Sequence, residues 1–385
     1  GSSLIDMYAK CGSLAIPKLV FKKLHRRDVV SWTALIAGYT DHGRSVKALE
    51  CVNKMKHEGI FLNSVTMVCI LKTCGNMRAV EKGQEIHSEI ERKGLFDVRD
   101  SLIEMYAKCG LLADARDVLE KLSNRSTYVW NSLLVGYTEC ENDWEALKCF
   151  EQMKQEGVPP DTLSFICILK SSGRIAAMDI GHQVHCEIER KGILLESNLV
   201  LGNALIGFYT KGGLLVTAKK VFERLPTRDI VSWNALIAGY AQEGHCNEVI
   251  KSFGQMQREG ILPDEVTFLC VLNACSHSGK FDEAQMYYES MNMEYGIAPK
   301  LAHHTCMVMA FGCAGRIEKA ISLIKTMPHW DESSVWIALL GACTKWGNLD
   351  LGGQAFEHVV GLNGKCSPAH ASMRNIYAIT LMREE

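Results

Sequence analysis

The chain has 385 residues, and its 42 Lys and Arg residues nearly balance its 44 Asp and Glu residues. This balance argues against nucleic-acid binding through a strongly basic surface alone, although it does not exclude a locally basic groove. No apolar run approaches the ~18 residues that a membrane-spanning helix needs. The 16 cysteines include Cys69, Cys167, Cys270 and Cys306, which lie in apolar stretches at related positions. We therefore expect free thiols, most of them buried, in a reducing compartment.

The chain opens on a decapeptide that returns three more times. The first copy, S-L-I-D-M-Y-A-K-C-G, covers residues 3–12, and later copies cover residues 101–110, 204–213 and 306–315. A second series, S-W-T-A-L-I-A-G-Y, starts at Ser31 and recurs around Trp130, Trp233 and Trp336. Both series repeat about every 100 residues, which is typical of a repeat array. Ser3 already lies within a first helix, so we expect the first repeat to be truncated and the chain to be a fragment.

Each long period divides into three units of unequal length. In the third period these units are residues 230–264, 265–300 and 301–331, with 35, 36 and 31 residues. Leu236 and Tyr240 are four residues apart in one stretch, and Val249, Phe253 and Met256 follow the same helical rhythm in the next. Each unit is therefore predicted to be a hairpin of two helices that buries its apolar face against its neighbours. The predicted fold is all-α, a right-handed superhelical solenoid.

One connection departs from this regular pattern. Ser101 lies only seven positions after Gly94, whereas Ala204 lies twelve positions after the equivalent Gly192. We expect this shortening to disturb the local register of the repeats.

Two short motifs invite comparison with zinc-dependent cytidine deaminases, which use H-x-E followed by C-x-x-C. His87-Ser88-Glu89 and His185-Cys186-Glu187 match H-x-E, but the sequence contains no C-x-x-C. A Walker loop and a G-x-S-x-G nucleophile elbow are also absent from the sequence. We therefore expect a binding module without a metal, a cofactor or catalytic residues.

The unit lengths and motif words resemble the plant pentatricopeptide repeat proteins of the PLS class. The words that carry the resemblance are V-V-S-W-T-A-L-I-A-G-Y, S-L-I-D-M-Y-A-K-C-G and G-Q-E-I-H-S-E-I, the last at residues 83–90. Residues 1–331 are similar to the repeat array, with about ten repeats, and residues 332–385 to an incomplete E-type C-terminal extension. The resemblance implies sequence-specific binding of single-stranded RNA in chloroplasts or mitochondria, most often for C-to-U editing.

In that family, two positions in each repeat select one RNA base: the fifth residue of the first helix and the last residue of the unit. We call these two residues the recognition pair. Carried onto this sequence, the pairs and their bases are Thr33 with Asn63 (A), Asn131 with Asp161 (U), Asn203 with Asp229 (U), Asn234 with Asp264 (U), Thr305 with Asp331 (G) and Ser2 with Asp28 (G). Asp100 and Ser126 depart from the pattern at both positions, so no base is assigned to that unit. The predicted target is G-A-N-N-U-N-U-U-N-G, written 5′ to 3′.

The 36-residue units differ at the fifth position, where they carry Val68, Ile166 and Leu269. Because these side chains cannot form hydrogen bonds, we expect these units to discriminate bases weakly or not at all. The alternative is that Asn and Thr only cap or solvate the first helix, although capping would not account for the paired Asp or Asn about thirty residues later.

Three valines lie three residues before a fifth position. Val30, Val200 and Val231 are expected to pack against base faces, as apolar side chains do in stacking sites. Their alternative role is packing between repeats.

Two functions stay open at this point. The favoured one is RNA recognition, with multiple organellar RNA editing factor (MORF) proteins and a DYW-type deaminase, in the same chain or a separate one, as partners that the resemblance implies. The alternative is a protein-interaction scaffold, because helical-hairpin arrays often bind peptides in a groove.

Overall fold

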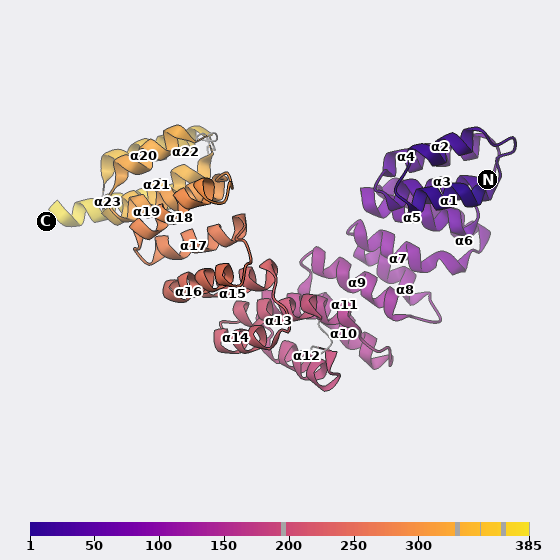
Figure 1. Ribbon diagram of the computed structural model, residues 1–385, viewed down its shortest axis with the longest axis horizontal. Coiled ribbons are helices and arrows are strands. Elements are labelled where there is room, and N and C mark those ends of the chain that lie inside the picture. Colours follow the sequence, from indigo (N-terminus) through magenta and orange to yellow (C-terminus); the bar gives the residue numbers. More distant parts are fainter. Residues whose placement is uncertain (194–197, 328–331, 347, 363–366, 385) are drawn as a thin grey trace. The chain divides into compact units, whose positions relative to one another are not determined.

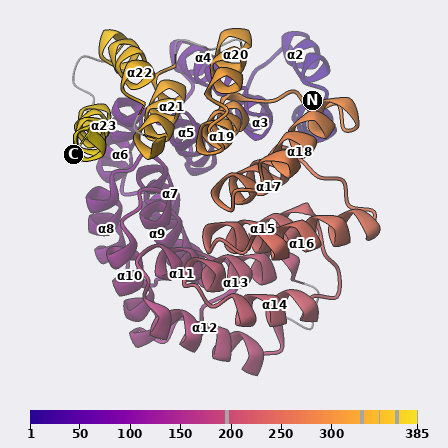
Figure 2. The same ribbon diagram turned by 90° about the vertical axis from the view of Figure 1, so that its left-hand side faces the viewer.

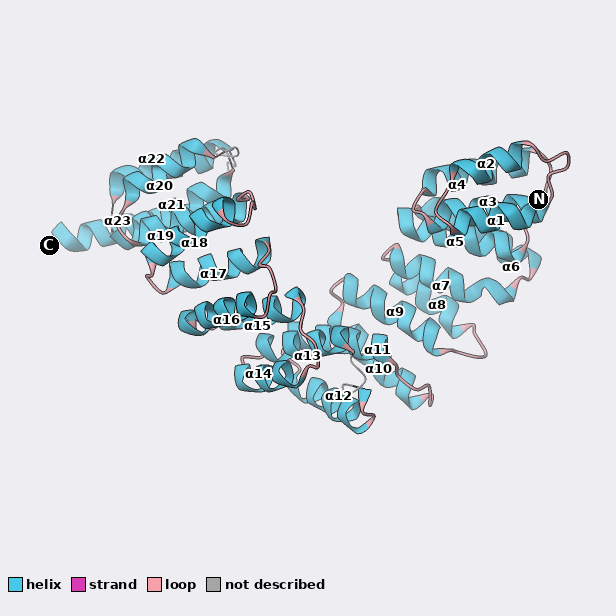
Figure 3. Cartoon of the chain, in the orientation of Figure 1, coloured by secondary structure: helices cyan, strands magenta, loops and turns pink. Residues whose placement is uncertain are grey.

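The computed structural model describes residues 1–193, 198–327, 332–346, 348–362 and 367–384. These residues form α-helices and a short 3₁₀ helix, with no strand among them (Figure 3). The predicted all-α solenoid of helical hairpins is confirmed. None of the described helices is both long and apolar enough to cross a membrane. Contacts within the chain divide it into unit 1, residues 1–184, and unit 2, residues 185–385, with the border inside α12 (Met178–Arg190).

Unit 1 is a row of helical hairpins. Its elements before α12 are α1 (Ser2–Lys10), α2 (Ala15–Lys22), α3 (Val29–Asp41), α4 (Ser45–His57), α5 (Ser64–Met77), α6 (Val80–Lys93), the 3₁₀ helix η1 (Phe96–Val98), α7 (Arg99–Lys108), α8 (Leu112–Glu120), α9 (Thr127–Glu139), α10 (Asp143–Gln155) and α11 (Thr162–Arg174). Each odd-numbered helix contacts the next odd-numbered helix, so these helices form one layer (Figures 1 and 2). The even-numbered helices from α2 to α10 each pack against the first helix of their own hairpin.

Unit 2 repeats this arrangement. Its elements after α12 are α13 (Leu199–Lys211), α14 (Leu215–Arg224), α15 (Ile230–Gln242), α16 (Cys246–Arg258), α17 (Glu265–His277), α18 (Phe281–Met293), α19 (Leu301–Cys313), α20 (Ile317–Thr326), α21 (Ser333–Trp346), α22 (Leu349–Leu362) and α23 (Ser367–Glu384). The layer of odd-numbered helices runs from α13 to α23 (Figure 1). α21, α22 and α23 fall in the predicted extension. Its proposed border at residue 331 lies outside the described residues and stays a prediction.

The apolar rhythm of the sequence corresponds to the buried face of each hairpin. In α15 the side chains of Leu236 and Tyr240 are buried, and in α16 those of Val249, Phe253 and Met256 are buried. Helical spacing places these residues on one side of each helix, where they pack against the neighbouring helices. The helical pattern predicted for this repeat is confirmed.

Polar side chains begin the first helices, and glycines end the second ones. In the described part of the chain, six first helices have an N-cap side chain that accepts a hydrogen bond from the backbone N–H of the third helical residue: Asp28, Asn63, Asp161, Asn198, Asp229 and Asp264. Gly157 and Gly260 follow α10 and α16 with φ of 74° and 77°, a left-handed conformation that favours glycine.

The short connection after Gly94 has the structural effect expected from its length. It contains η1, and α7 begins at Arg99, so Asp100 is the second residue of its helix. The equivalent residue, Asn203, is the fifth residue of α13. Val98, just before α7, is buried and anchors the shortened connection. The predicted disturbance of the repeat is thus the loss of the first three residues of its first helix.

The described cysteines are free thiols, as the sequence predicts, but the expectation that most are buried is wrong, because only six of the 15 described cysteines are fully buried. Cys167 is buried, whereas Cys69, Cys270 and Cys306 are partly buried. Burial raises the pKa of each of these four thiols to about 11. At neutral pH they are therefore protonated, which is the less reactive form of the side chain.

Candidate nucleic-acid interface

The recognition pair Asn131 and Asp161 is brought together in unit 1. Asn131 lies in the second turn of α9, and Asp161 is the N-cap of α11 in the next hairpin. The amide nitrogen of Asn131 donates to both carboxylate oxygens of Asp161, at 3.0 Å and 2.9 Å. Asp161 also accepts the backbone N–H of Ser164 at 3.0 Å, so the carboxylate links two neighbouring hairpins.

This pair lines a pocket of about 380 Å³. The wall includes the exposed side chains of Tyr128 and Leu163, which lie three residues before Asn131 and Ile166 respectively. Glu104 and Lys108 of α7 supply charged groups to the same wall. The pocket therefore combines apolar surfaces with a small set of fixed polar groups, as ligand pockets commonly do.

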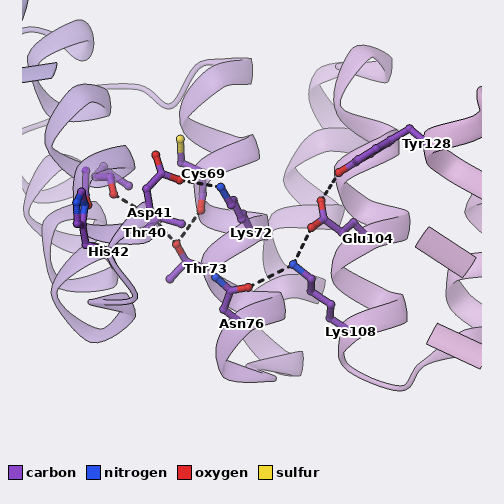
Figure 4. A network of polar contacts seen from close by, with 12 residues as sticks. Thr40, Asp41, His42, Cys69, Lys72, Thr73, Asn76, Glu104, Lys108 and Tyr128 are labelled. Carbon is purple, nitrogen blue, oxygen red and sulfur yellow. Dashed lines mark hydrogen bonds and ion pairs between the residues drawn. The ribbon is translucent and has the colours of Figure 1, made fainter. Parts of the chain in front are cut away.

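A polar network holds one side of this pocket in place (Figure 4). The hydroxyl of Tyr128 donates to Glu104, and Lys108 donates to Glu104 at 2.7 Å and to Asn76 at 3.3 Å. Burial opposes ionisation of Glu104, but the hydrogen bonds from Lys108 and Tyr128 outweigh it, so the pKa of Glu104 lies below its ordinary value. Burial, together with the adjacent Glu104 carboxylate, raises the pKa of Tyr128. The tyrosine is thus a neutral, hydrogen-bonded ring at neutral pH.

A second pair of the same kind lies in unit 2. The amide nitrogen of Asn234 donates to Asp264 at 3.0 Å, and the hydroxyl of Thr267 donates to the amide oxygen of Asn234 at 2.6 Å. Burial disfavours the charged form of Asp264, but hydrogen bonds from Thr267 and Asn234 outweigh this effect. The pKa of Asp264 therefore lies below its ordinary value, and the carboxylate accepts hydrogen bonds at neutral pH.

The pair Asn203 and Asp229 is also in contact, with a different hydrogen-bond pattern. The amide nitrogen of Asn203 lies 3.3 Å from Asp229. The hydroxyl of Ser232 donates to Asp229 at 2.8 Å. Among the described residues, no group donates a hydrogen bond to the buried amide oxygen of Asn203.

Thr33 and Asn63 are joined through a third residue. The hydroxyl oxygens of Thr33 and Thr66 are 2.6 Å apart, and Thr66 donates to the Asn63 side-chain oxygen at 2.7 Å. Asn63 also caps α5 by accepting the backbone N–H of Thr66.

The remaining predicted positions are not brought together in the described part of the chain. Asp28 caps α3 by accepting the backbone N–H of Ser31, and no hydrogen bond joins it to Ser2 among the described residues. The hydroxyl of Thr305 donates to the Leu301 carbonyl at 2.9 Å, while its predicted partner Asp331 lies outside the described residues.

The structure changes one argument made from the sequence. Asn63, Asp161, Asp229 and Asp264 cap the next hairpin, and the last three also bond the fifth residue of their own unit. Capping, together with the hydrogen bonds between hairpins, explains why a polar fifth residue occurs together with Asp or Asn as the last residue of the same unit. The joint occurrence of the two residues therefore does not by itself distinguish base recognition from a structural role. The expectation that capping would not account for the paired Asp or Asn is wrong.

A row of exposed apolar side chains accompanies the pairs. Val30, Val200 and Val231 are 54%, 64% and 53% exposed, which does not fit the alternative of packing between repeats. Sequence reasoning missed four further members at the same place in other units, also exposed: Val65, Tyr128, Leu163 and Val266. Their position, three residues before each fifth position, was a signal that could have found them.

The H-x-E histidines have a structural partner in each case. The Nδ1 atom of His87 lies 2.8 Å from the Tyr106 hydroxyl, and that of His185 lies 2.6 Å from the Tyr209 hydroxyl. Burial raises the pKa of both tyrosines to about 12. The equivalent geometry explains why the two motifs occupy equivalent places. The residues described contain no group of three or more His, Cys, Asp or Glu arranged to hold a metal ion.

Comparisons with known proteins agree with the arrangement of the hairpins. A PPR repeat model matches residues 100–126, 128–158, 203–230, 266–294 and 302–331. A second model, of the PPR repeat family, matches residues 27–76 and 228–277. PPR10 in complex with an 18-nucleotide psaJ RNA element has a similar fold, with a TM-score of 0.65 and 18% identity over 97% of this chain and 60% of that one.

Two Arabidopsis thaliana proteins are similar along almost the whole chain. The mitochondrial pentatricopeptide repeat-containing protein At1g06140 is 33% identical over 98% of this chain and 68% of its own length. Pentatricopeptide repeat-containing protein At2g33680 is 34% identical over 100% of this chain and 53% of its own length. The chain thus spans about half to two thirds of these relatives, and on the repeat matches and these identities it belongs to the pentatricopeptide repeat family.

Proposed function

We propose that the chain binds single-stranded RNA and recognises about one base per repeat through its recognition pairs. The observation that carries this proposal is the pocket of unit 1, which Asn131 and Asp161 line together with the exposed side chains of Tyr128 and Leu163. Aromatic and apolar faces stack on unpaired bases, and the polar pair can meet the edge of the same base. Helical repeats that take one base each recognise RNA in this way.

The chemistry of the pair suits uracil. The carboxylate of Asp161 only accepts hydrogen bonds, whereas the amide nitrogen of Asn131 donates them. Uracil presents a ring N–H donor beside carbonyl acceptors, so one edge can satisfy both groups. The equivalent pair Asn234 and Asp264 supports the same assignment.

The full proposed target is G-A-N-N-U-N-U-U-N-G. In this order the second base, A, belongs to Thr33 and Asn63, and the fifth, seventh and eighth bases, all U, belong to the three Asn–Asp pairs. The tenth base, G, belongs to Thr305 and Asp331, and the first, also G, to Ser2 and Asp28.

The cellular role we propose is site selection for C-to-U editing in organellar transcripts. The PLS and E-type motif words of the sequence support this role, and relatives that carry a mitochondrial name support an organelle as the location. The chain is proposed to supply the address, and a DYW-type deaminase, in the same protein or recruited to it, the chemistry. MORF proteins are proposed as further partners.

The first test is binding of the purified chain to RNA that contains the proposed target. The control RNA has G in place of the seventh and eighth bases. We expect tighter binding of the target RNA and, in Asn234→Ser, a preference that changes at the eighth base alone. A change of base preference at the eighth base alone would indicate that each recognition pair contacts an individual base.

A protein-interaction scaffold is the second candidate function. The near balance of 42 basic and 44 acidic residues favours it, because many RNA-binding domains are distinctly basic. Equal and weak binding of both RNAs would favour the protein-interaction scaffold, or a chain that binds RNA only together with a partner protein.

A further inference from the structure

The 36-residue units carry apolar side chains at the fifth position, yet each places a hydroxyl beside the preceding recognition pair. This hydroxyl belongs to the third residue of the unit's first helix. We call it the third-position hydroxyl, and it is that of Thr66, Ser164 or Thr267. All three residues are buried, with exposed fractions of 0%.

We propose that the third-position hydroxyl is a positioning residue for base selection, because it fixes which end of the recognition amide faces the base. This inference rests on the proposed function. It assigns the 36-residue units an indirect part in selecting the base of the preceding unit.

The orientation of the Asn131 amide follows from its two neighbours. The carboxylate of Asp161 can only accept, so the amide must turn its nitrogen toward it, at 2.9–3.0 Å. The amide oxygen then faces the hydroxyl of Ser164 at 2.6 Å. The same hydroxyl lies 3.1 Å from Asp161, so its one hydrogen is donated over the shorter distance, to Asn131. Asn131 is only 5% exposed, so a flipped amide would lose both contacts without access to bulk water.

The same orientation recurs in unit 2. Asp264 accepts from the Asn234 amide nitrogen. The hydroxyl of Thr267 donates to the Asn234 amide oxygen at 2.6 Å and lies farther, 3.0 Å, from Asp264. Serine and threonine thus perform the same task at equivalent places. In the first of the 36-residue units, the hydroxyl of Thr66 links Thr33 to Asn63.

Amide orientation matters because uracil and cytosine differ in the hydrogen-bonding group at ring position 4. Uracil has a carbonyl acceptor there, which suits an amide N–H, whereas cytosine has an amino donor, which suits an amide oxygen. A fixed amide whose oxygen is already occupied therefore favours uracil. Removing the hydroxyl leaves a buried amide oxygen without a donor, and the amino group of cytosine can then satisfy it.

The chain contains its own comparison at the seventh base. The Asn203 amide oxygen is buried and has no hydrogen-bond donor among the described residues, because the Ser232 hydroxyl reaches only Asp229, at 2.8 Å, and not the amide. We therefore expect the preference for U over C to be smaller at the seventh base than at the fifth and eighth bases.

The test measures the ratio of the dissociation constants for C and U at one base, with the rest of the target RNA unchanged. In Ser164→Ala we expect the preference for U at the fifth base to fall about fivefold, the factor that one neutral hydrogen bond provides. The conservative variant Ser164→Thr should keep it, since threonine occupies the equivalent place in unit 2. Thr267→Val, tested at the eighth base, provides the same measurement at an independent site.

Ser232→Ala is the matched control. Ser232 and Ser164 both accept the backbone N–H of their N-cap residue, at 3.3 Å and 3.2 Å, so both variants lose the same capping contact. The preference at the seventh base should be unchanged in Ser232→Ala. An equal loss there would show that weaker capping, and not the contact with the amide, lowers selectivity, and would overturn the inference.

Two further outcomes are decisive. If the unaltered chain prefers U at the fifth base and Ser164→Ala keeps the full preference, the positioning role is wrong while the proposed function stands. If the unaltered chain separates U from G but binds U and C equally at all three bases, the positioning role is also wrong while base recognition stands. If it binds U, C and G equally at all three bases, base recognition fails, and the positioning role fails with it.

Discussion

Tyr128 stands apart from the other members of the exposed apolar row because it is aromatic and its hydroxyl is held by Glu104. Its ring is 53% exposed beside the Asn131–Asp161 pair, where a base can stack on it. We expect Tyr128→Ala to weaken binding of the target RNA by about 1–3 kcal/mol, or roughly 5- to 150-fold, the usual contribution of base stacking on an aromatic ring. Equilibrium binding by fluorescence anisotropy measures this loss.

Tyr128→Phe separates stacking from the polar network. Phenylalanine keeps the aromatic face and loses only the hydrogen bond to Glu104, so we expect binding close to that of the unaltered chain. A loss in Tyr128→Phe as large as that in Tyr128→Ala would contradict stacking and point to Glu104 as the important group.

Single side chains also show where sequence reasoning succeeds and where it stops. The pairs Asn131–Asp161, Asn203–Asp229 and Asn234–Asp264 were predicted from the sequence, and their members lie within hydrogen-bonding distance. Ser164 was not predicted as part of the site. Its contact with Asn131 joins side chains 33 residues apart, and its distance depends on how one hairpin seats on the next. Such seating is a product of packing, which a motif does not encode.

Close approach of neighbouring first helices depends on glycine at one repeated place. A Cβ atom added to Gly239 in α15 would lie 2.4 Å from Thr210 Cγ2 and 2.5 Å from Thr210 Cβ. These atoms lie next to the backbone of α13 and cannot swing away as the end of a long side chain can. We expect Gly239→Ala to destabilise unit 2 by about 1–3 kcal/mol, the usual cost of overpacking. Urea unfolding followed by circular dichroism gives the measurement.

Gly254→Ala is the control for this prediction. Gly254 lies within α16, and nothing is found within 4 Å of an added Cβ. The substitution should therefore stabilise the helix by up to about 1 kcal/mol, because alanine has the higher helix propensity. Equal effects of the two substitutions would mean that helix propensity and not helix approach decides the outcome at Gly239.

The helical hairpins themselves were predictable, because apolar rhythm, N-caps and terminal glycines all agree. The start of α7, the first helix after Gly94, was harder to predict. Its sequence, R-D-S-L-I-E-M-Y-A-K, fits the repeat, yet α7 has 10 residues where α13 has 13. The short distance along the chain from Gly94 to Ser101 indicated a disturbance, but only the structure shows that the helix loses its first three residues and that the buried Val98 anchors η1.

Over the whole chain, charges of opposite sign are frequently paired with one another. Lys72 pairs with Asp41 at 2.7 Å, and Lys108 pairs with Glu104 at 2.7 Å, both on first helices of unit 1 (Figure 4). Pairing leaves fewer cations for RNA phosphates, and the formal net charge is −2 with neutral histidines. Affinity for RNA should therefore depend mainly on stacking and hydrogen bonds, with a small contribution from counterion release.

This charge distribution predicts a weak dependence of RNA binding on salt. A plot of log Kd against log salt concentration between about 50 and 200 mM should have a slope below about 3, equivalent to about four phosphates at ~0.7 each. Asp41→Asn removes the partner of Lys72, which frees one cation, so its slope should rise by at most ~0.7. A slope of about 6 or more in the unaltered chain would contradict the prediction. It would mean that binding rests on basic groups rather than on the recognition pairs, and such binding would discriminate poorly between the target RNA and the control RNA, because phosphates are the same in both.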